Sequence, residues 1–222
     1  MNWQENGKNV YNAPEYTFEV TGDRNLTAIL ENVSGRLPLG YREVEYIQSD
    51  NYCGIDTGYS PSLYDDKIIV DIMAENYTSG DEYIFGNLLV SNRNIRLYRT
   101  SSDTIGVQTS SLTKSISADI SNVRALINWD SLARDLRING EFVTSVSRVG
   151  YSGGRLYLFS HEASNKSIKA KLYSAKVYNQ DSLIRDFIPC IDPANTIGLY
   201  DLVEGQFHQN AWSGMLTAGP AV

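Results

Sequence analysis

The last 40 residues of the chain contain four short runs, Leu183-Ile-Arg-Asp-Phe-Ile-Pro-Cys190, Ile197-Gly-Leu-Tyr-Asp-Leu-Val203, Gly205-Gln-Phe207 and Leu216-Thr-Ala-Gly-Pro220. Residues that favour turns separate these apolar and aromatic runs. Short strands at such spacing are typical of a β-sandwich or a β-barrel. This part of the sequence therefore predicts an all-β architecture, but it contains no pattern that requires a particular chemistry.

The middle of the chain repeats with a period of two residues. In the run 67–73, Ile68, Val70 and Ile72 alternate with more polar residues, as a strand that is buried on one face requires. Two further runs have the same period, with inward positions expected at Val123, Ala125, Ile127 and Trp129 in the run 123–130 and at Tyr173, Ala175 and Val177 in the run 171–178.

The dipeptide Asn139-Gly140 lies between two strand-like runs. Both of its residues accept positive φ, which makes it a strong signal for a two-residue β-hairpin. No sustained alternation of strands with helices is present, so a parallel sheet with a nucleotide-binding crevice is not expected. Further strands are predicted at residues 44–48, 53–57, 82–85, 95–100, 104–108, 155–160, 184–188, 197–202 and 206–209.

Composition bounds the class of protein. With 222 residues, the chain is long enough for one large all-β domain with a well-buried core. Its formal net charge of −7 argues against a nucleic-acid partner, because such binding depends on cations that neutralise phosphates. No run approaches the roughly 20 apolar residues of a membrane-spanning helix.

A boundary between two segments is predicted near residues 33–37, where turn-forming residues precede Pro38. Ahead of it lie two strand candidates, 16–20 and 26–30, joined by a turn at 21–25. A two-stranded hairpin is marginally stable alone in water. This segment is therefore expected to pack on the main domain or on another chain.

The main domain resembles a known family. Leu37-Pro-Leu-Gly-Tyr41, Val44-Glu-Tyr-Ile-Gln48 and Ile55-Asp-Thr-Gly58 are similar to the opening of the laminin-G-like, concanavalin-A-like sandwich of bacterial surface and bacteriophage proteins. Arg185-Asp-Phe-Ile-Pro-Cys190, Gly198-Leu-Tyr-Asp-Leu202 and Thr217-Ala-Gly-Pro220 resemble the end of that family, and Tyr83-Ile-Phe-Gly86, Leu156-Tyr-Leu-Phe159 and Leu172-Tyr-Ser-Ala-Lys176 occur between them in the expected order. The resemblance implies an antiparallel jelly-roll β-sandwich over residues 37–222, with its two ends paired.

The first 33 residues resemble a different module. Trp3-Gln-Glu-Asn-Gly7, Tyr16-Thr-Phe-Glu-Val-Thr21 and Asp23-Arg-Asn-Leu-Thr-Ala28 are similar to the second half of an internalin-B-type bacterial surface repeat, whose first half is missing. The resemblance implies a small N-terminal β-hairpin extension over residues 1–33. Both modules imply display outside a cell, on a bacterial surface or on a virion.

The sequence offers little support for a catalytic or metal site. A glycoside hydrolase needs two carboxylates beside the scissile bond, and the alternating pair Glu43 and Glu45 is explained as well by a solvated strand edge. His208 is far from His161 in sequence and no Gly-x-Ser-x-Gly motif is present, so a catalytic triad has no support. No cofactor is predicted, and Ca²⁺ is left open because such sandwiches often bind it through loop carboxylates. Solvated loop acids are the simpler interpretation of its candidate ligands, Asp65, Asp66, Asp81, Glu82 and Asp103.

Glycan recognition requires an aromatic ring that stacks on the apolar face of a sugar and planar polar groups that bind hydroxyls. Arg96 and Tyr98 are expected to share one face of a strand, and Tyr157 and His161 lie in or just after a strand expected near the centre of a sheet. We predict these four as ligand-binding residues, with ordinary cross-strand packing as the alternative. Trp212 is expected to cap the sandwich edge.

The only cysteines are Cys53 and Cys190. Two cysteines cannot build a disulfide scaffold or a four-ligand zinc site. If the first and last strands of the domain are neighbours, these two could meet in a disulfide. The sequence favours the alternative, two small buried core residues, because free cysteine is among the most commonly buried residue types.

Three functions remain open. The first is a non-catalytic recognition module that binds a carbohydrate or a host-surface receptor, as part of a bacterial adhesin or a phage receptor-binding or tail protein. The second is a structural virion or surface-assembly protein that contacts mainly other proteins, with residues 1–33 as a docking or oligomer-forming segment. The third and least favoured is a glycoside hydrolase. An extracellular location is expected in each case, without a nucleic-acid partner and without a membrane span.

Overall fold

The computed structural model describes residues 2–11, 17–19, 22–29, 35–62, 64–87, 94–109, 112–147, 154–161 and 167–222. The chain divides into two compact units, Met1–Gly35 and Arg36–Val222. A search of the described residues finds no helix with the length and apolar character needed to cross a membrane.

The first unit is a three-stranded sheet. β1 (Asn2–Glu5) and β2 (Lys8–Tyr11) form a hairpin around Asn6 and Gly7, which take positive φ values of 52° and 78°. β3 (Leu26–Ile29) pairs with β1, giving the order β2-β1-β3. The sequence predicted that the strand at 26–30 pairs with a strand at 16–20. This pairing is wrong, because residues 17–19 form no strand and β3 pairs with β1 instead. Residues 12–16, 20, 21 and 30–34, which include parts of both predicted strands and of the predicted boundary, lie outside the described residues.

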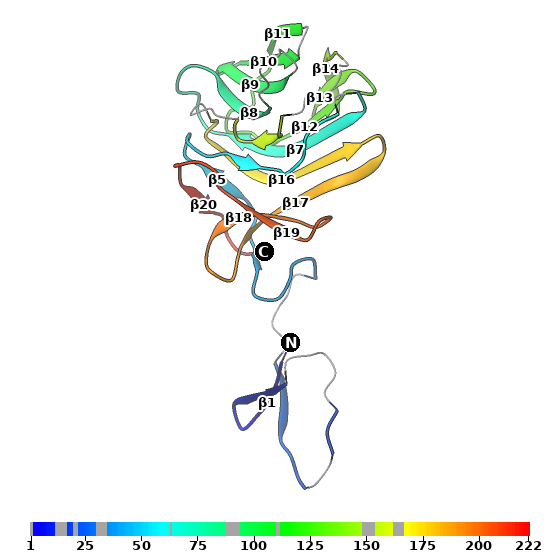
Figure 1. Ribbon diagram of the computed structural model, residues 1–222. Helices are drawn as coiled ribbons and strands as arrows, with labels where there is room; N and C mark the ends of the chain where they lie inside the picture. Colours follow the sequence, from blue (N-terminus) through cyan, green and yellow to red (C-terminus); the bar gives the residue numbers. More distant parts are fainter. Residues whose placement is uncertain are drawn as a thin grey trace. The chain divides into compact units, whose positions relative to one another are not determined.

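The second unit is a sandwich of two antiparallel sheets, as predicted (Figure 1). The smaller sheet contains β6 (Ile55–Asp56), β8 (Glu82–Gly86), β9 (Ile95–Ser101), β10 (Thr104–Thr109), β11 (Leu112–Ser117) and β15 (Tyr157–Leu158), in the order β11-β10-β9-β8-β15-β6. The larger sheet contains β4 (Arg42–Glu43), β5 (Ile47–Ser49), β7 (Asp66–Ala74), β12 (Ala125–Asp130), β13 (Asp135–Ile138), β14 (Glu141–Ser145), β16 (Ala170–Asn179), β17 (Ser182–Ile191), β18 (Ile197–Asp201), β19 (Gln206–Gln209) and β20 (Leu216–Ala218). Figure 1 shows β7, β16 and β17 as the long strands of this sheet.

The core lies between the two sheets and follows the period of two. Along β7, buried and half-buried residues alternate without a break, and Ile68 and Val70 have no exposed surface. Trp129 of β12 is fully buried, with its ring centroid 6.0 Å from that of Phe85 in the opposite sheet. Removing these apolar side chains from water stabilises the sandwich by about 25 cal/mol for each Å² that is buried.

Two of the expected inward positions are wrong. Val123 precedes β12 and its side chain is 58% exposed. Tyr173 faces outward, because the pairing of β16 with β7 is irregular between Leu172 and Ser174 and this places Leu172 in the core instead. An irregularity of this kind changes the face that each following residue occupies.

Two predicted connections are confirmed. Asn139 and Gly140, at φ values of 52° and 84°, form the turn between β13 and β14. The two ends of the sandwich also pair, since β20 lies antiparallel to β5 with Leu216 opposite Ser49. The terminal runs that predicted the fold thus complete the larger sheet.

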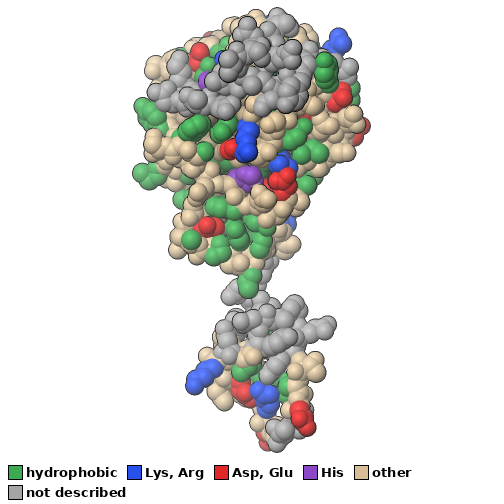
Figure 2. Space-filling model, in the orientation of Figure 1, with side chains coloured by type: hydrophobic (Ala, Val, Ile, Leu, Met, Phe, Trp, Pro, Cys, Tyr) green, Lys and Arg blue, Asp and Glu red, His purple; other side chains and the backbone are tan. Residues whose placement is uncertain are grey.

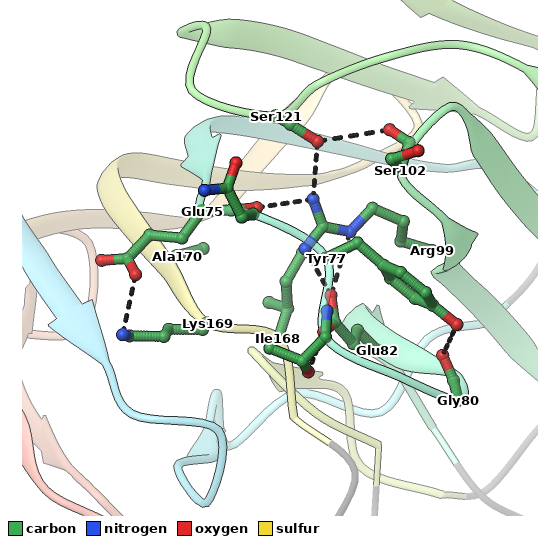
Figure 3. A network of polar contacts seen from close by, with 12 residues as sticks. Glu75, Tyr77, Gly80, Glu82, Arg99, Ser102, Ser121, Ile168, Lys169 and Ala170 are labelled. Atoms are coloured by element: carbon green, nitrogen blue, oxygen red, sulfur yellow. Dashed lines mark hydrogen bonds and ion pairs between the residues drawn. The ribbon is translucent and has the colours of Figure 1, made fainter.

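A buried polar network joins the two sheets beneath β8 and β9 (Figure 3). Arg99 has no exposed surface and binds Glu82 through Nε and Nη2. Its Nη1 donates to the carbonyl of Glu75, just after β7, at 2.7 Å and to Oγ of Ser121 at 2.9 Å. Glu82 accepts two further hydrogen bonds from the backbone N–H and the hydroxyl of Thr78, at 3.0 and 2.8 Å. Both buried charges are therefore paired and hydrogen-bonded, as burial of an ion pair requires.

Both cysteines are buried free thiols, so the disulfide left open by the sequence does not form in this structure. Cys53 belongs to the main core, whereas Cys190 packs in a separate cluster with Leu37, Ile188 and Tyr200. Burial raises the pKa of each thiol to about 12. The two residues thus act as small apolar side chains.

Charged side chains of both signs lie side by side on one face of the sandwich (Figure 2). Apolar and uncharged side chains lie between these small mixed groups of charges. Among the residues coloured by type in that view, there is no continuous basic stripe of the kind that follows a phosphate backbone.

Candidate binding face of the six-stranded sheet

β9 lies near the centre of the smaller sheet, between β8 and β10. Its alternation sends Ile95 and Leu97 into the core and sends Arg96 and Tyr98 to the outer side. The register of the sheet places Tyr83 of β8 and Gly106 of β10 on either side of Tyr98. The outer side chains form what we call the aromatic face, made up of Tyr83, Arg96, Tyr98, Gln108, Tyr157, His161 and Trp212.

Two glycines form the floor of the aromatic face. The ring of Tyr98 lies across Gly106, where any Cβ would overlap the ring carbons. A Cβ at Gly86 would lie 3.1 Å from Cβ of His161 and 3.2 Å from Cγ of Arg96. Glycine at both positions lets these side chains lie close against the sheet. His161 and Arg96 therefore converge over Gly86.

Ring contacts connect one half of the aromatic face. The ring centroids of Tyr83 and Tyr98 are 5.2 Å apart, and that of His161 is 4.1 Å from Tyr83 in an edge-to-face arrangement. These distances and angles are those that aromatic pairs favour. The contacts hold two phenols and one imidazole together above the centre of the sheet.

The other half of the face centres on Tyr157. This residue pairs with Gly86, which in turn pairs with Arg96, so Tyr157 and Arg96 lie on the same side about 10 Å apart at the usual spacing of strands. Trp212 stacks on Tyr157 with centroids 5.6 Å apart and an interplanar angle of 24°. The indole also covers Gly54, where a Cβ would overlap it.

The structure brings together all four residues that the sequence predicted. Arg96, Tyr98, Tyr157 and His161 lie on one outer face, around Gly86. Their role in binding a ligand stays a prediction. Sequence reasoning missed Tyr83 and Gln108, and it assigned Trp212 only as an edge cap.

The phenols of Tyr83 and Tyr98 stay neutral because their pKa values are raised. Burial raises the pKa of Tyr83 and of Tyr98, and the charge of Asp81 raises both further, whereas the Arg96 guanidinium acts in the opposite direction. Both hydroxyls therefore remain hydrogen-bond donors at physiological pH. Nη1 of Arg96 donates to Oε1 of Gln108 at 3.2 Å, and its buried Nε has no hydrogen-bond partner.

The loop that carries Trp212 is fixed by Asp50. Its carboxylate accepts from the backbone N–H groups of Met215 at 2.8 Å and Tyr52 at 3.1 Å. Burial raises the pKa of Asp50, but these two backbone hydrogen bonds and one from Cys53 outweigh it and the pKa is lowered. A groove of about 330 Å³ lies beside the loop, lined by Thr196, Gln209, Asn210, Trp212 and Met215 among others.

Three of the acids weighed as calcium ligands, Asp66, Glu82 and Asp103, have protein partners. Asp66 is buried and accepts from Tyr59 at 2.6 Å and from Asn179 at 3.0 Å. Glu82 belongs to the Arg99 network described above, and Asp103 accepts from Ser101 and Thr104 at 2.8 and 3.2 Å. In the part of the chain that the structure describes, no group of three or more His, Cys, Asp or Glu residues could hold a metal ion.

The acidic pair weighed for glycoside hydrolysis does not share a site. Glu43 is 8% exposed and pairs with Arg36. Glu45 is exposed and lies beyond the end of β4. The two carboxylates thus have different surroundings, which is not the arrangement of two acids flanking one scissile bond.

The outer face of the larger sheet also carries tyrosines, and the arginine beside them is paired with an aspartate. Arg124 makes two hydrogen bonds to Asp71, at 2.8 and 2.7 Å, and lies 4.0 Å from the ring centroid of Tyr173. The rings of Tyr173 and Tyr46 are 5.6 Å apart. These contacts satisfy the charged groups within the sheet.

Comparison with known proteins shows the fold. No protein-family model matches the chain, and no curated protein matches its sequence. Its structure is similar to that of a "putative carbohydrate binding protein" from Bacteroides ovatus, with a TM-score of 0.56 and 10% identity over 82% of this chain and 62% of that one. The chain therefore spans less than two thirds of the length of that protein.

Two other solved structures are similar at lower scores. One is the IT-sialidase CBM40 of Ruminococcus gnavus, with a TM-score of 0.47 and 14% identity over 62% of this chain and 90% of that one. The other is the heptameric SAP-like pentraxin of Limulus polyphemus, with a TM-score of 0.43 and 13% identity over 80% of this chain and 90% of that one. The shared fold is an antiparallel, concanavalin-A-like β-sandwich.

Proposed function

We propose that the protein is a non-catalytic glycan-recognition module that binds its ligand on the aromatic face. The observation that carries the proposal is a group of half-buried side chains, Arg96, His161 and Trp212, on one outer sheet face. They lie over the rings of Tyr83, Tyr98 and Tyr157, which are 6, 9 and 8% exposed. The outer face of an antiparallel sheet is ordinarily polar and solvated. Rings supply flat apolar surface for the C–H face of a sugar, and neutral phenols and planar amides supply hydrogen bonds to its hydroxyls.

The glycines beneath the rings support this proposal. Gly86 and Gly106 each leave room that a Cβ would fill. This room lets Tyr98, Arg96 and His161 lie close against the sheet. The description of the Bacteroides ovatus protein as carbohydrate-binding agrees with the proposal, although at 10% identity that likeness bears on the fold alone.

The setting that we propose is a bacterial surface protein, or the tail or receptor-binding protein of a phage, outside the cell that makes it. The sequence resemblance of residues 37–222 to laminin-G-like modules, and of residues 1–33 to part of an internalin-B-type repeat, supports this setting. A glycan or host-surface receptor is the expected partner.

A glycan array with matched variants tests the proposal, run both with calcium and with a chelator. The wild-type chain should retain a glycan, and Trp212→Ala should weaken binding about 5- to 30-fold, the cost of removing a stacking ring that contributes 1 to 2 kcal/mol. Tyr173→Ala is the control, because Tyr173 also stands on an outer sheet face in an aromatic pair, but in the other sheet. Equal losses from both variants, or no retained glycan, would contradict the proposal.

A second candidate function is protein assembly, and one surface feature favours it. A groove of about 580 Å³ runs between the end of β11 and the β13–β14 hairpin, lined by Ile116, Ile138 and Phe142 among others. Phe142 is 60% exposed there. If this function is the right one, light scattering should show an oligomer or partner complex that Phe142→Ser or deletion of residues 1–33 dissociates, and the array should stay empty.

A further inference from the structure

We infer that the ligand of the aromatic face is an acidic glycan, one that bears a carboxylate, and that Arg96 binds this group. The inference rests on the proposed function and adds the chemical class of the ligand. It starts from the charge balance of the arginines and from the surroundings of the Arg96 guanidinium.

Among the described residues, the arginines other than Arg96 that are withdrawn from water have a carboxylate partner. Arg99 is paired with Glu82, and Arg185, 6% exposed, is paired with Asp201 at 3.4 Å and with Glu204 at 2.7 Å. The half-buried Arg24 and Arg137 follow the same rule, with Glu5 at 2.7 Å and Asp135 at 2.9 Å. The rule has a physical cause, because a charge that loses its hydration is costly unless an opposite charge replaces it.

Arg96 is the exception. It is half-buried, and no carboxylate of the described residues lies within ion-pair distance of it. The other arginines without an ion pair among the described residues, Arg42 and Arg134, are exposed and keep their hydration. Among the described residues, no ion pair therefore neutralises Arg96, and the nearby charge of Asp81 acts on Tyr83 and Tyr98 without an ion pair to the guanidinium.

The hydrogen bonds of Arg96 are incomplete as well. One terminal nitrogen donates to Gln108, and a hydrogen bond with the guanidinium also acts on the hydroxyl of Tyr83. The buried Nε has no acceptor. A guanidinium presents parallel N–H groups that match the two oxygens of a carboxylate. A carboxylate on the ligand would supply both the missing charge and further acceptors.

The neighbours of Arg96 fit a sugar acid better than other anions. The neutral hydroxyls of Tyr83 and Tyr98 can donate to anionic or hydroxyl oxygens. Their rings, 6 and 9% exposed, form an apolar floor beside Arg96. A nucleic acid would need several cations along a track, whereas Arg96 is the one cation among the described residues that make up the aromatic face, in a chain of net charge −7. An acidic peptide remains an outcome of the test.

Paired probes test the inference by titration calorimetry. Each acidic glycan, an oligogalacturonide and a sialyllactose, is compared with its counterpart in which the carboxyl group has been reduced to an alcohol. At a salt concentration of about 50 mM, the acid that binds should do so about 10- to 100-fold more tightly than its reduced form, as a charge-assisted bidentate contact implies. Arg96→Gln should abolish this difference, so that the acidic and the reduced form bind with the same affinity.

Arg124→Gln is the matched control, since it removes an arginine from the outer face of the other sheet, and it should change neither affinity. Equal binding of acidic and reduced probes would overturn the inference while leaving glycan recognition intact. A loss of both probes in Arg96→Gln, with the fold retained by circular dichroism, would also overturn it, as would tighter binding of a polyglutamate peptide. Failure of the wild type to bind any glycan on the array would instead remove the proposed function.

Discussion

Replacing Arg99 with methionine should destabilise the sandwich strongly. The guanidinium has no exposed surface, and it donates to Glu82, to the carbonyl of Glu75 and to Ser121. Arg99→Met keeps a side chain of suitable length but leaves the Glu82 carboxylate, whose side chain is 4% exposed, without its counter-charge. Breaking one side of such a buried pair costs about 3 to 5 kcal/mol. In a domain of this size that corresponds to a fall in melting temperature of about 6 to 20 °C.

Urea unfolding followed by tryptophan fluorescence measures this loss, because Trp129 is fully buried in the core of the same unit. The urea concentration at the midpoint of unfolding should fall, while the slope of the free energy of unfolding against urea concentration stays the same. This combination separates a change in stability from a change in the unfolded state. Arg124→Met is the control. It removes an ion pair of the same bidentate geometry, at 2.8 and 2.7 Å, but with an arginine side chain that is 55% exposed.

The control should lose only about 0 to 1 kcal/mol, since water screens exposed pairs. Similar losses in the two variants would refute the reasoning that burial sets the cost. The double variant Glu82→Leu with Arg99→Met adds a second check. It should be more stable than Arg99→Met alone, because no uncompensated charge remains. If it is less stable, packing around Arg99 and not the unpaired carboxylate accounts for the loss.

Gly54→Ala should displace the indole of Trp212, which occupies the place of the new Cβ, and cost about 1 to 3 kcal/mol in urea unfolding, whereas Gly22→Ala, with open space around it, should not. Iodoacetamide at about pH 8 should leave the native protein unlabelled and label both cysteines after unfolding, because burial holds the pKa of each thiol at about 12; rapid labelling of the native protein would contradict the burial of both thiols. The pKa of Asp50 is lower in the folded chain than in the unfolded one, so its charge stabilises the fold at neutral pH. This stability is lost as the pH falls through the folded pKa. The advantage of the wild type over Asp50→Asn in free energy of unfolding should therefore shrink below about pH 4. A constant difference between these two proteins from pH 7 to about pH 2 would show that the charge on Asp50 has no part in it.

Regular strands and tight turns were predictable because their signals are local. The alternation of Ile68, Val70 and Ile72 predicts the buried face of β7 without knowledge of its neighbours. Asn139-Gly140 predicts its hairpin because both residues tolerate positive φ. The same chemistry at Asn6-Gly7 forms the β1–β2 hairpin, so the error in the first unit came from the pairing of later residues and not from an absent signal.

Errors arose where one strand's face depends on its partner. Tyr173 has an inward phase in the sequence, but the irregular register of β16 against β7 moves it outward. β11 alternates between half-buried and exposed residues only, because it is an edge strand with one neighbour. The sequence of β11 therefore lacks a row of alternating apolar residues, the pattern from which a strand is predicted.

The aromatic face was predictable only in part, for the same reason. Arg96 and Tyr98 follow from the alternation of β9. Tyr83 lies in a strand whose five residues are all buried, so its sequence gives no inner and outer side. Trp212 has a polar local sequence, and its stacking partner Tyr157 comes from a different sheet segment. The glycine floor at Gly86 has a meaning only once the neighbouring side chains are known.

β9 carries an arginine on each of its faces, and the contrast between them connects the fold to the proposed function. Arg99 points into the sandwich, where Glu82 neutralises it, and the same pairing of β8 with β9 sets Tyr83 opposite Tyr98 on the outer side. The inner ion pair therefore fixes the register that brings the two outer rings together. Among the described residues no carboxylate forms an ion pair with Arg96, and its buried Nε has no acceptor, which is costly for a charge withdrawn from water. An anion from outside the chain resolves that imbalance at the place where the rings already offer a sugar its stacking surface.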